Sequence, residues 1–342
     1  MNRFFFHLAR VFPLVPLKTL TSATKQRTIF PFYHAVSNEE IIHIKHLYKI
    51  RSTGDFERDL DFLVKNFIPE DILTFQEKLK NNEPLKHNSF ILSFDDGLSE
   101  FYDIIAPILL RKGIPATCFL NSGFIDNRDL FFRYKASVLV EKVKKAQSVS
   151  FIEKAKIFLK SKNLRAKDIS ESILAINYPN RSFLDELAKI LEVDFNDYLN
   201  VKKPYMSSDQ INSLLGKGFR FGAHSIDHPE YAHIQLDEQI SQTLESITDV
   251  TNRFQLNYKF FSFPFTDFDV SGRFFSRVFS KEHPIADMTF GSAGLKNDSC
   301  KGNIQRIPIE TDNFTAREII RGEYYYYIFK GLFNKNTIPR GN

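Results

Sequence analysis

The chain has 342 residues, enough to bury a substantial core, and α/β barrels of this length are often a single domain. Hydrophobic residues make up 43% of the sequence and charged residues 25%, the ordinary balance of a globular protein. The net charge of +5 is mildly basic, but Lys and Arg are spread along the chain, so we expect no nucleic-acid partner; attraction to an anionic glycan or membrane surface stays open.

Residues 1–27 form an apolar segment that is interrupted by charged residues and prolines. It is too short and too broken for a transmembrane helix, and it shows no obvious cleavage site of a signal peptide. The two cysteines, Cys118 and Cys300, are too few for a disulfide framework and match no zinc motif. We therefore expect a cytoplasmic protein whose first segment packs on its core; contact of residues 1–20 with a membrane surface is the alternative.

Strand-like and helical patterns alternate along the chain. The apolar runs predict strands over Thr28–His34, Ser89–Phe94, Pro115–Asn121, Phe219–His224, Phe260–Phe265 and Gln305–Ile309. The helical patterns between them cover Phe56–Phe67, Phe101–Lys112, Ser208–Leu215, Leu236–Phe254 and Ala316–Phe329. Such alternation predicts parallel strands joined by right-handed crossovers, and six or seven units indicate a closed or nearly closed α/β barrel.

The alternation pauses between about residues 127 and 203, where helix follows helix. The predicted helices are Tyr134–Lys145, Phe151–Lys160 and Ser182–Leu191. Their lysine-rich faces are typical of solvated surfaces, so we expect a helical insertion that caps or flanks the barrel. The predicted organisation is a barrel over residues 28–334 containing this insertion, followed by a C-terminal tail over residues 335–342.

Two adjacent carboxylates, Asp95 and Asp96, follow the apolar run Phe90–Leu92 and precede Gly97. A buried strand that ends in this way delivers both acids to the rim of the sheet, where α/β folds bind ligands. Because adjacent strand residues point to opposite faces, one acid can hold a metal while the other handles a proton. The alternative is ordinary turn chemistry, since Asp-Gly pairs are common in turns.

His224 and His228 form a second motif, at the end of the strand-like run Phe219–His224 and just beyond it. Two histidines four residues apart converge on one point where the backbone turns helically. Together with one carboxylate they suit Zn²⁺, with Co²⁺, Mn²⁺ or Ni²⁺ as competitors. Three protein ligands leave a coordination position for water, which is the catalytic arrangement. The histidine spacing alone is a weak signal; joined to the Asp-Asp-Gly motif it becomes a strong one.

Ser93–Gly97 (Ser-Phe-Asp-Asp-Gly) and His224–His228 (His-Ser-Ile-Asp-His) resemble the first two motifs of the polysaccharide deacetylase family, carbohydrate esterase family 4, also described as the NodB homology domain. The resemblance covers about residues 28–310. Phe32–His34 resembles the end of the family's first strand, and Phe261–Phe265 its third motif. The resemblance implies an irregular (β/α)₇ barrel, which agrees with the alternation of elements.

By position, the resemblance implies that Asp95 is the general base and that Asp96, His224 and His228 are the metal ligands. It implies hydrolysis of an acetyl group, N-acetyl before O-acetyl, on a polysaccharide, oligosaccharide or glycoconjugate. The proline and aromatic residue of the third motif, here Pro264 and Phe265, would wall the substrate groove.

Two departures from the family pattern stand out. Ser262 occupies the place of an arginine that usually orients the catalytic aspartate, and the chain has no histidine after His283 to serve as the late general acid. His283 itself precedes the sixth predicted strand, Gln305–Ile309, and does not match that motif. The proton for the leaving amine could come from Asp95, from metal-bound water or from His34. The alternatives to a sugar deacetylase are a hydrolase of another carbon–nitrogen bond and a barrel that binds metal and glycan without turnover.

Three further residues at expected strand ends are candidates for binding the substrate. His34 could line the pocket, with a hydrogen-bonded structural histidine as the alternative. Asp267 could bind a hydroxyl or amine at the rim, with a turn or helix cap as the alternative. Arg306 could reach the site from its strand, because charged residues at strand ends in barrels can be functional. The sequence indicates no oligomeric state.

Overall fold

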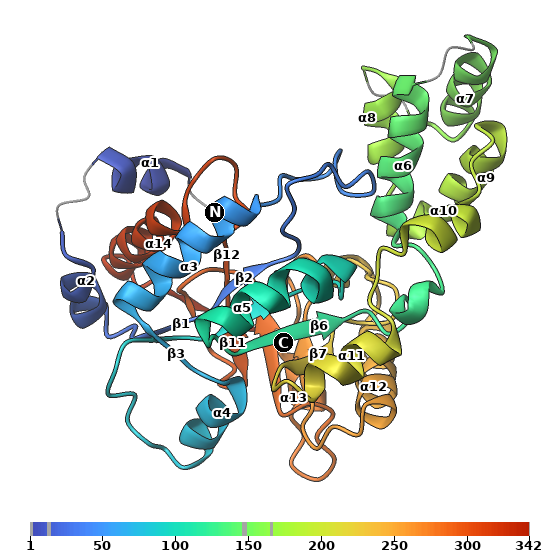
Figure 1. Ribbon diagram of the computed structural model, residues 1–342. Helices are drawn as coiled ribbons and strands as arrows, with labels where there is room; N and C mark the ends of the chain where they lie inside the picture. The colour runs from blue at the N-terminus through green and yellow to red at the C-terminus, as the bar shows by residue number, and fades with distance from the viewer. Residues whose placement is uncertain (1–2, 12–14, 146–148, 165–166, 342) are drawn as a thin grey trace.

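The computed structural model describes residues 3–11, 15–145, 149–164 and 167–341 (Figure 1). Residues 1–2 and 12–14 of the predicted apolar segment lie outside the described residues. The same is true of residues 146–148 and 165–166 of the predicted insertion and of residue 342 of the predicted tail.

Eight strands form one parallel sheet in the order β11-β9-β8-β7-β6-β5-β2-β12. Their bounds are β2 (Pro31–Tyr33), β5 (Leu92–Phe94), β6 (Ala116–Leu120), β7 (Arg220–Ala223), β8 (Phe260–Ser262), β9 (Met288–Gly291), β11 (Asn303–Gln305) and β12 (Ile307–Pro308). A smaller parallel sheet joins β1 (Thr28–Ile29), β4 (Ser89–Phe90) and β3 (Ile68–Pro69). Strand β9 lies between the predicted strands Phe260–Phe265 and Gln305–Ile309 and was not predicted from the sequence.

The two edges of the eight-stranded sheet belong to one short stretch of chain. β11 pairs with β9, whereas β12, which follows after the single residue Arg306, pairs with β2. The segment from β11 to β12 therefore closes the sheet. Because β11 and β12 together fill one strand position between β9 and β2, the almost complete barrel has seven strand positions. The predicted irregular (β/α)₇ barrel is confirmed.

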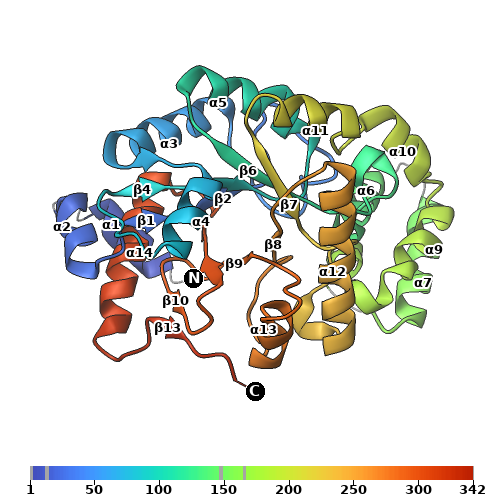
Figure 2. The ribbon, with the colours of Figure 1, turned by 90° about the horizontal axis from the view of Figure 1, so that it is seen from below.

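Helices surround the barrel, as Figure 2 shows. The predicted outer helices are present, and the structure adds α4 and α13; the bounds are α3 (Thr53–Asn66), α4 (Ile72–Lys80), α5 (Ala106–Lys112), α11 (Ser208–Leu215), α12 (Leu236–Arg253), α13 (Gly272–Val278) and α14 (Ala316–Gly331). Helices α11 and α14 begin with capping boxes, at Ser207 with Gln210 and at Thr315 with Glu318, which explains why their predicted starts are accurate. A π-helical turn, Phe101–Ile105, leads into α5.

The predicted insertion is helical and stands beside the barrel (Figure 1). Its α-helices are α6 (Phe132–Lys145), α7 (Val149–Ser161), α8 (Ile169–Leu174), α9 (Ser182–Ile190) and α10 (Phe195–Lys202). Helix α6 contacts α8 and α9. Their shared interior includes Leu139, Ile173 and Leu184, all fully buried. The insertion thus has apolar packing of its own, and the N-terminal end of α6 faces the barrel.

Both ends of the chain pack on the barrel. Helices α1 (Arg3–Val11) and α2 (Leu17–Thr24) lie on α14, where Gly322 allows the close approach: a Cβ there would lie 2.4 Å from the ring of Phe6. Within the predicted tail, β13 (Thr337–Ile338) pairs with β10 (Asn297–Asp298). Among the described residues, no helix combines the length and the apolar character needed to cross a membrane.

The aromatic core beneath the first strands provides a test of the fold. Phe56 on α3 is fully buried against Tyr33 and Phe94. Phe56→Ala should lower the free energy of unfolding by about 3–5 kcal/mol, because a large cavity remains. Val64→Ala on the same helix, where the side chain is 42% exposed, should change it by less than about 0.5 kcal/mol. Urea unfolding followed by circular dichroism measures both, and equal effects would contradict the described core.

Candidate metal centre and substrate pocket

The chain turns sharply where β5 ends. Asp96 has a φ of 73° and Gly97 a φ of 68°, so two left-handed residues follow Asp95, the first residue after the strand. The backbone N–H of Asp95 still donates to the carbonyl of Tyr33 on β2, which keeps Asp95 in the barrel. The turn sends the two neighbouring carboxylates to different partners, as the sequence predicts for adjacent residues at a strand end.

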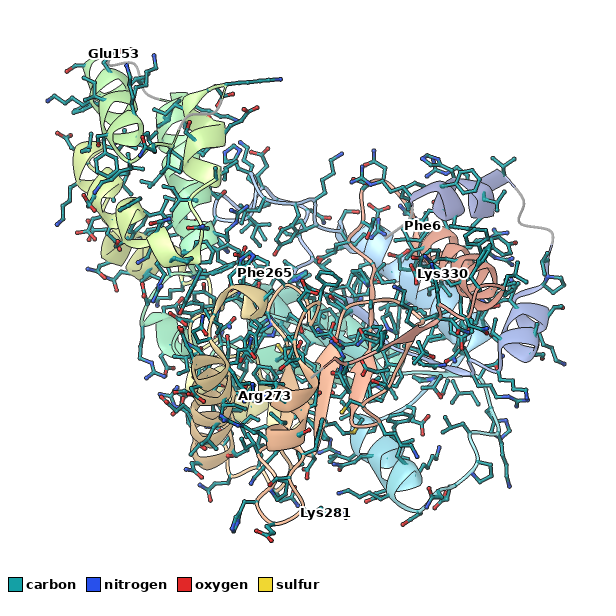
Figure 3. All side chains as sticks on the ribbon, turned by 180° about the vertical axis from the view of Figure 1, so that it is seen from behind. Phe6, Glu153, Phe265, Arg273, Lys281 and Lys330 are labelled. Atoms are coloured by element: carbon teal, nitrogen blue, oxygen red, sulfur yellow. The ribbon has the colours of Figure 1, made fainter. Side chains whose placement is uncertain are left out.

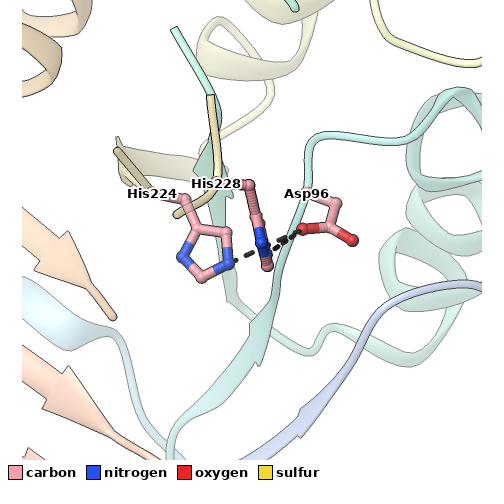
Figure 4. A group of neighbouring side chains, drawn as sticks. All are labelled: Asp96, His224 and His228. Carbon is pink, nitrogen blue, oxygen red and sulfur yellow. Dashed lines mark ion pairs between the residues drawn. The ribbon is translucent and has the colours of Figure 1, made fainter. Parts of the chain in front are cut away.

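Asp96, His224 and His228 come together, as Figure 4 shows. One ligand atom from each lies within 4.8 Å of the others, and all three residues are buried. The Asp96 Oδ1 atom lies 3.3 Å from His228 Nε2 and 3.6 Å from His224 Nε2. Although burial acts to raise the pKa of Asp96, the neighbouring His228 helps to hold that pKa below its ordinary value.

Hydrogen bonds from neighbouring groups determine which atoms of His224 and Asp96 are left to bind a metal ion. His224 Nδ1 lies 2.8 Å from the carbonyl oxygen of Ser262; donating an N–H there leaves Nε2 with a lone pair. The Tyr134 hydroxyl donates to Asp96 Oδ2 over 2.6 Å, and Oδ1 has no hydrogen-bond partner among the described residues. An orphaned buried carboxylate oxygen beside two imidazole nitrogens is the donor set of a divalent metal, so the residues present fit such an ion.

Unusual backbone conformations gather around the cluster. Besides Asp96, the non-glycine residues Ser225, His228 and Phe265 have φ of 68°, 63° and 54°. Left-handed residues are uncommon outside glycine and persist only where surrounding contacts hold them, which is typical of functional sites. One such contact is the backbone N–H of His228, which donates to Ser225 Oγ over 3.0 Å.

Asp95 is held by Arg306, which enters from the seam between β11 and β12. Two guanidinium nitrogens of Arg306 lie 2.8 and 2.7 Å from the two carboxylate oxygens of Asp95, and both residues are buried. The same guanidinium donates to Ser93 Oγ and Ser262 Oγ over 3.1 and 2.6 Å. Although burial acts to raise the pKa of Asp95, Arg306 lowers it below its ordinary value.

Arg306, between β11 and β12, makes the contact with Asp95 that an arginine at the position of Ser262 was expected to make. Ser262 is small enough to leave room for Arg306 and accepts one of its hydrogen bonds. Arg306 lines the pocket, where its guanidinium is engaged with Asp95 and two serines. These contacts suit the positioning of Asp95; direct binding of the substrate by Arg306 stays a prediction.

His34 pairs with Glu310 just beyond the neighbouring strands β2 and β12. The Nδ1 atom of His34 lies 2.6 Å from Glu310 Oε2, and the backbone N–H groups of His34 and Ala35 donate to the same carboxylate. Burial acts to lower the pKa of His34, but Glu310, together with the nearby Asp96 and Asp95, raises the pKa to about 9. At neutral pH this histidine is an imidazolium that can donate a proton.

The insertion, predicted to cap or flank the barrel, contributes residues to the site directly. Tyr134 lies on α6 and binds Asp96, and the Tyr134 hydroxyl is also 3.3 Å from that of Tyr48. The ring of Phe131 lies 4.2 Å from that of His228 between centroids. Sequence reasoning missed these residues. The signal present was the group of aromatic residues Phe131, Phe132 and Tyr134 at the start of the first predicted helix of the insertion.

A pocket of about 380 Å³ joins these groups. It is lined by residues from the barrel, from the loop before α3 and from the insertion, which are Phe32, His34, Leu47, Tyr48, Asp95, Asp96, Phe131, Arg133, His224, His228, Phe263, Phe265, Ser292, Arg306, Pro308 and Glu310. Phe265, 41% exposed, packs its ring on His228 at the rim, which fits the predicted aromatic wall. Pro264 is buried beside it and does not line the pocket.

Asp267 lies outside this pocket, which corrects its prediction as a rim carboxylate for the substrate. It is 1% exposed and accepts hydrogen bonds from Asn303 and Gln305 over 2.8 and 2.6 Å. It also forms an ion pair with Arg340, which binds Asp298 as well. Its Oδ2 atom therefore ties β11 and Arg340 to the loop after β8.

Comparison with known proteins agrees with this geometry. The family model described as polysaccharide deacetylase matches residues 82–274, more than half of the chain. No curated protein matches. The chain belongs to the polysaccharide deacetylase family and is a hydrolase of carbon–nitrogen bonds other than peptide bonds.

Solved structures share the fold at low sequence identity. The Streptococcus pyogenes deacetylase PplD in complex with acetate is 13% identical with a TM-score of 0.53, covering 86% of this chain and 97% of that one. IcaB from Ammonifex degensii is 12% identical with the same score and coverage. A de-N-acetylase from Aggregatibacter actinomycetemcomitans is 14% identical with a TM-score of 0.51, covering 85% and 99%. These likenesses establish the barrel fold.

The hydrogen bond from Tyr134 to Asp96 generates a prediction about metal affinity. Tyr134→Phe should weaken Zn²⁺ binding about 10- to 100-fold, because the carboxylate loses the donor that orients it. Competition with a chromogenic chelator measures the affinity without any substrate. Tyr198→Phe is the matched control, since that insertion tyrosine bonds to His43 and should leave the affinity unchanged. Equal affinities in all three proteins would refute the positioning role of Tyr134.

Proposed function

We propose that this protein is a metal-dependent deacetylase that removes acetyl groups, N-acetyl in particular, from a polysaccharide, oligosaccharide or glycoconjugate. The observation that supports the proposal is that two adjacent carboxylates in one pocket have different partners. Asp95 is bound by Arg306, whereas Asp96 faces His224 and His228 with an oxygen that has no other hydrogen-bond partner among the described residues.

The proposed cofactor is one divalent cation, Zn²⁺ before Co²⁺, Mn²⁺ or Ni²⁺, held by Asp96, His224 and His228. When bound, such a cation polarises a carbonyl group and lowers the pKa of water. His224 is already oriented for this role, because its Nδ1 is occupied by the Ser262 carbonyl. The rings of Phe131 and Phe265 flank His228 and shield the cluster from bulk water.

Asp95 is the proposed general base. It accepts a proton from the attacking water while the water oxygen forms a bond to the acetyl carbon. Arg306 keeps the Asp95 carboxylate ionised and fixes the plane in which its oxygens lie, since both oxygens are bound by the same guanidinium. The carbon–nitrogen bond then breaks, and acetate and a free amine leave.

His34 is the proposed general acid for the leaving amine. It lines the same pocket as Asp95, and Glu310 orients its ring through Nδ1 and keeps it protonated at neutral pH. This pair stands in place of the late histidine that the sequence lacks. With Arg306 in place of the third-motif arginine, both departures that favoured a binding-only barrel have a structural counterpart, which supports turnover.

The division of roles can be tested with two substitutions. Asp95→Asn should keep the metal and lower the rate of acetate release by at least about 100-fold, because the general base is lost. His224→Ala should weaken metal binding itself, because a ligand is lost. Metal content and acetate release from acetylated chitooligosaccharides are measured on the same preparations. Activity unaffected by both changes would sink the site assignment; bound metal without acetate release from any acetylated glycan would favour the binding-only barrel.

The His34–Glu310 pair predicts the alkaline limb of the pH profile. The protonated form of His34 is the acid, so kcat/KM should fall as the pH rises through about 9. Glu310→Gln removes the group that raises this pKa, so the fall should begin at a lower pH and activity at neutral pH should drop. Glu39→Gln, on the surface, is the control. An alkaline limb that stays in place in Glu310→Gln would exclude His34 as the titrating acid.

A further inference from the structure

Arg133 is a cation of the pocket lining that the proposed reaction does not use. It is the second residue of α6 and reaches the pocket from the insertion. Its neighbours along the chain contact the proposed metal ligands: the ring of Phe131 packs on that of His228, and the hydroxyl of Tyr134 donates to Asp96. The backbone of Arg133 is therefore held close to the proposed reaction centre.

The other charged groups that line the pocket have partners. His34 pairs with Glu310, and Arg306 pairs with Asp95. The remaining carboxylate of the lining belongs to the proposed metal site. Arg133, in contrast, forms no ion pair within the described part of the chain. It therefore contributes a positive charge to the pocket that no neighbouring carboxylate matches.

The surroundings of Arg133 make this unmatched charge costly. Burial lowers the pKa of Arg133 below its ordinary value, although the carboxylate of Glu230 acts to raise it. Glu230 forms its ion pair with His233, over 2.8 Å, and none with Arg133. A cation that is partly removed from water is stabilised when an anion accompanies it. The pocket therefore favours a ligand that brings a negative charge to Arg133.

A single hydrogen bond to the protein holds the guanidinium of Arg133. Its Nη1 atom donates to the backbone carbonyl of Leu174, the last residue of α8, where the negative end of the helix dipole favours a cation. A guanidinium has five N–H donors in one plane, and the others on Arg133 have no partner among the described residues. Such a planar set of donors suits the paired oxygens of a carboxylate or a phosphate.

The pocket offers space for a sugar next to this cation. Its volume of about 380 Å³ lies within the range of sites that bind small molecules. The rings of Phe131 and Phe265 lie 6.0 Å apart between centroids, and Figure 3 shows Phe265 directly below the insertion. The side of the pocket that carries Arg133 is thus continuous with the aromatic wall beside the proposed metal site.

We propose that Arg133 binds an anionic substituent, a carboxylate or a phosphate, of the glycan substrate. This inference rests on the proposed deacetylase function and narrows its substrate class to acidic glycans. The insertion supplies the recognition of charge, whereas the barrel supplies the proposed chemistry. Arg133 acts here as a binding residue and takes no part in proton transfer.

Binding of three small sugars to the full chain in the presence of Zn²⁺ tests the proposal. N-acetylglucosamine is the neutral probe, N-acetylmuramic acid carries a carboxylate, and N-acetylglucosamine 6-phosphate carries a phosphate. NMR titration gives the Kd of each. At least one acidic sugar should bind about ten-fold more tightly than the neutral sugar, because charged hydrogen bonds to Arg133 form. The acidic sugar that binds more tightly distinguishes carboxylate from phosphate.

Substitutions assign the preference to Arg133. Arg133→Gln should bring the affinities for the acidic and neutral sugars together, and Arg133→Lys should keep part of the difference, because the charge stays while the planar donors are lost. The matched control is Arg273→Gln on α13, which should keep the full difference. Arg273 is exposed, does not line the pocket, and lies away from Phe265 in Figure 3. Circular dichroism checks that each variant is folded; if Arg133→Gln is not, an undiminished preference in Arg133→Lys contradicts the proposal.

Three results would overturn the role of Arg133: equal affinity of the unchanged protein for acidic and neutral sugars, no binding of either acidic sugar, or a preference that Arg133→Gln retains. Acetate release is measured separately on the same sugars. Release without any preference for charge refutes the role of Arg133 and leaves the proposed function standing. A preference that Arg133→Gln abolishes, without release from any acetylated sugar, supports the anion site and counts against the proposed function.

Discussion

The buried ion pair between Asp95 and Arg306 is the interaction on which the site depends. Arg306 is the only residue between β11 and β12, the two segments that close the barrel on β9 and β2. A buried carboxylate without its partner would cost about 3–5 kcal/mol. Formation of the pair therefore requires the barrel to close at the register that brings Arg306 to Asp95. The same contact that forms when the barrel closes therefore also orients the proposed base, Asp95.

At the proposed metal site, too, a single residue serves two groups. Ser262 contributes its carbonyl to His224 and its hydroxyl to Arg306, so one residue at the end of β8 aligns a proposed ligand and the group that holds the proposed base. The serine is compatible with both tasks because it is small. A long side chain at this position, such as the arginine usual in the family, would occupy the space of Arg306.

Short local motifs could be predicted from the sequence, whereas contacts between residues far apart in the chain could not. Asp95, Asp96, His224 and His228 are recognisable because each stands in a short motif at the end of an apolar run, and parallel strands bring such ends together. Arg306 was expected to reach the site, but its partner depends on how the barrel closes. Tyr134 depends on how the insertion docks, and the use of Asp267 by Arg340 depends on the path of the last residues. No periodicity encodes these long-range contacts.

The hydroxyl of Tyr134 has a consequence for the insertion as a whole. It joins a helix with its own apolar packing to a proposed ligand of the metal, so occupancy of the metal centre and docking of α6 are thermodynamically linked. Linkage is reciprocal: an ion that favours the bound orientation of Asp96 also favours the docked helix, by the same factor. The docked position of the insertion is therefore tied to the orientation of Asp96, although the insertion supplies none of the three proposed metal ligands.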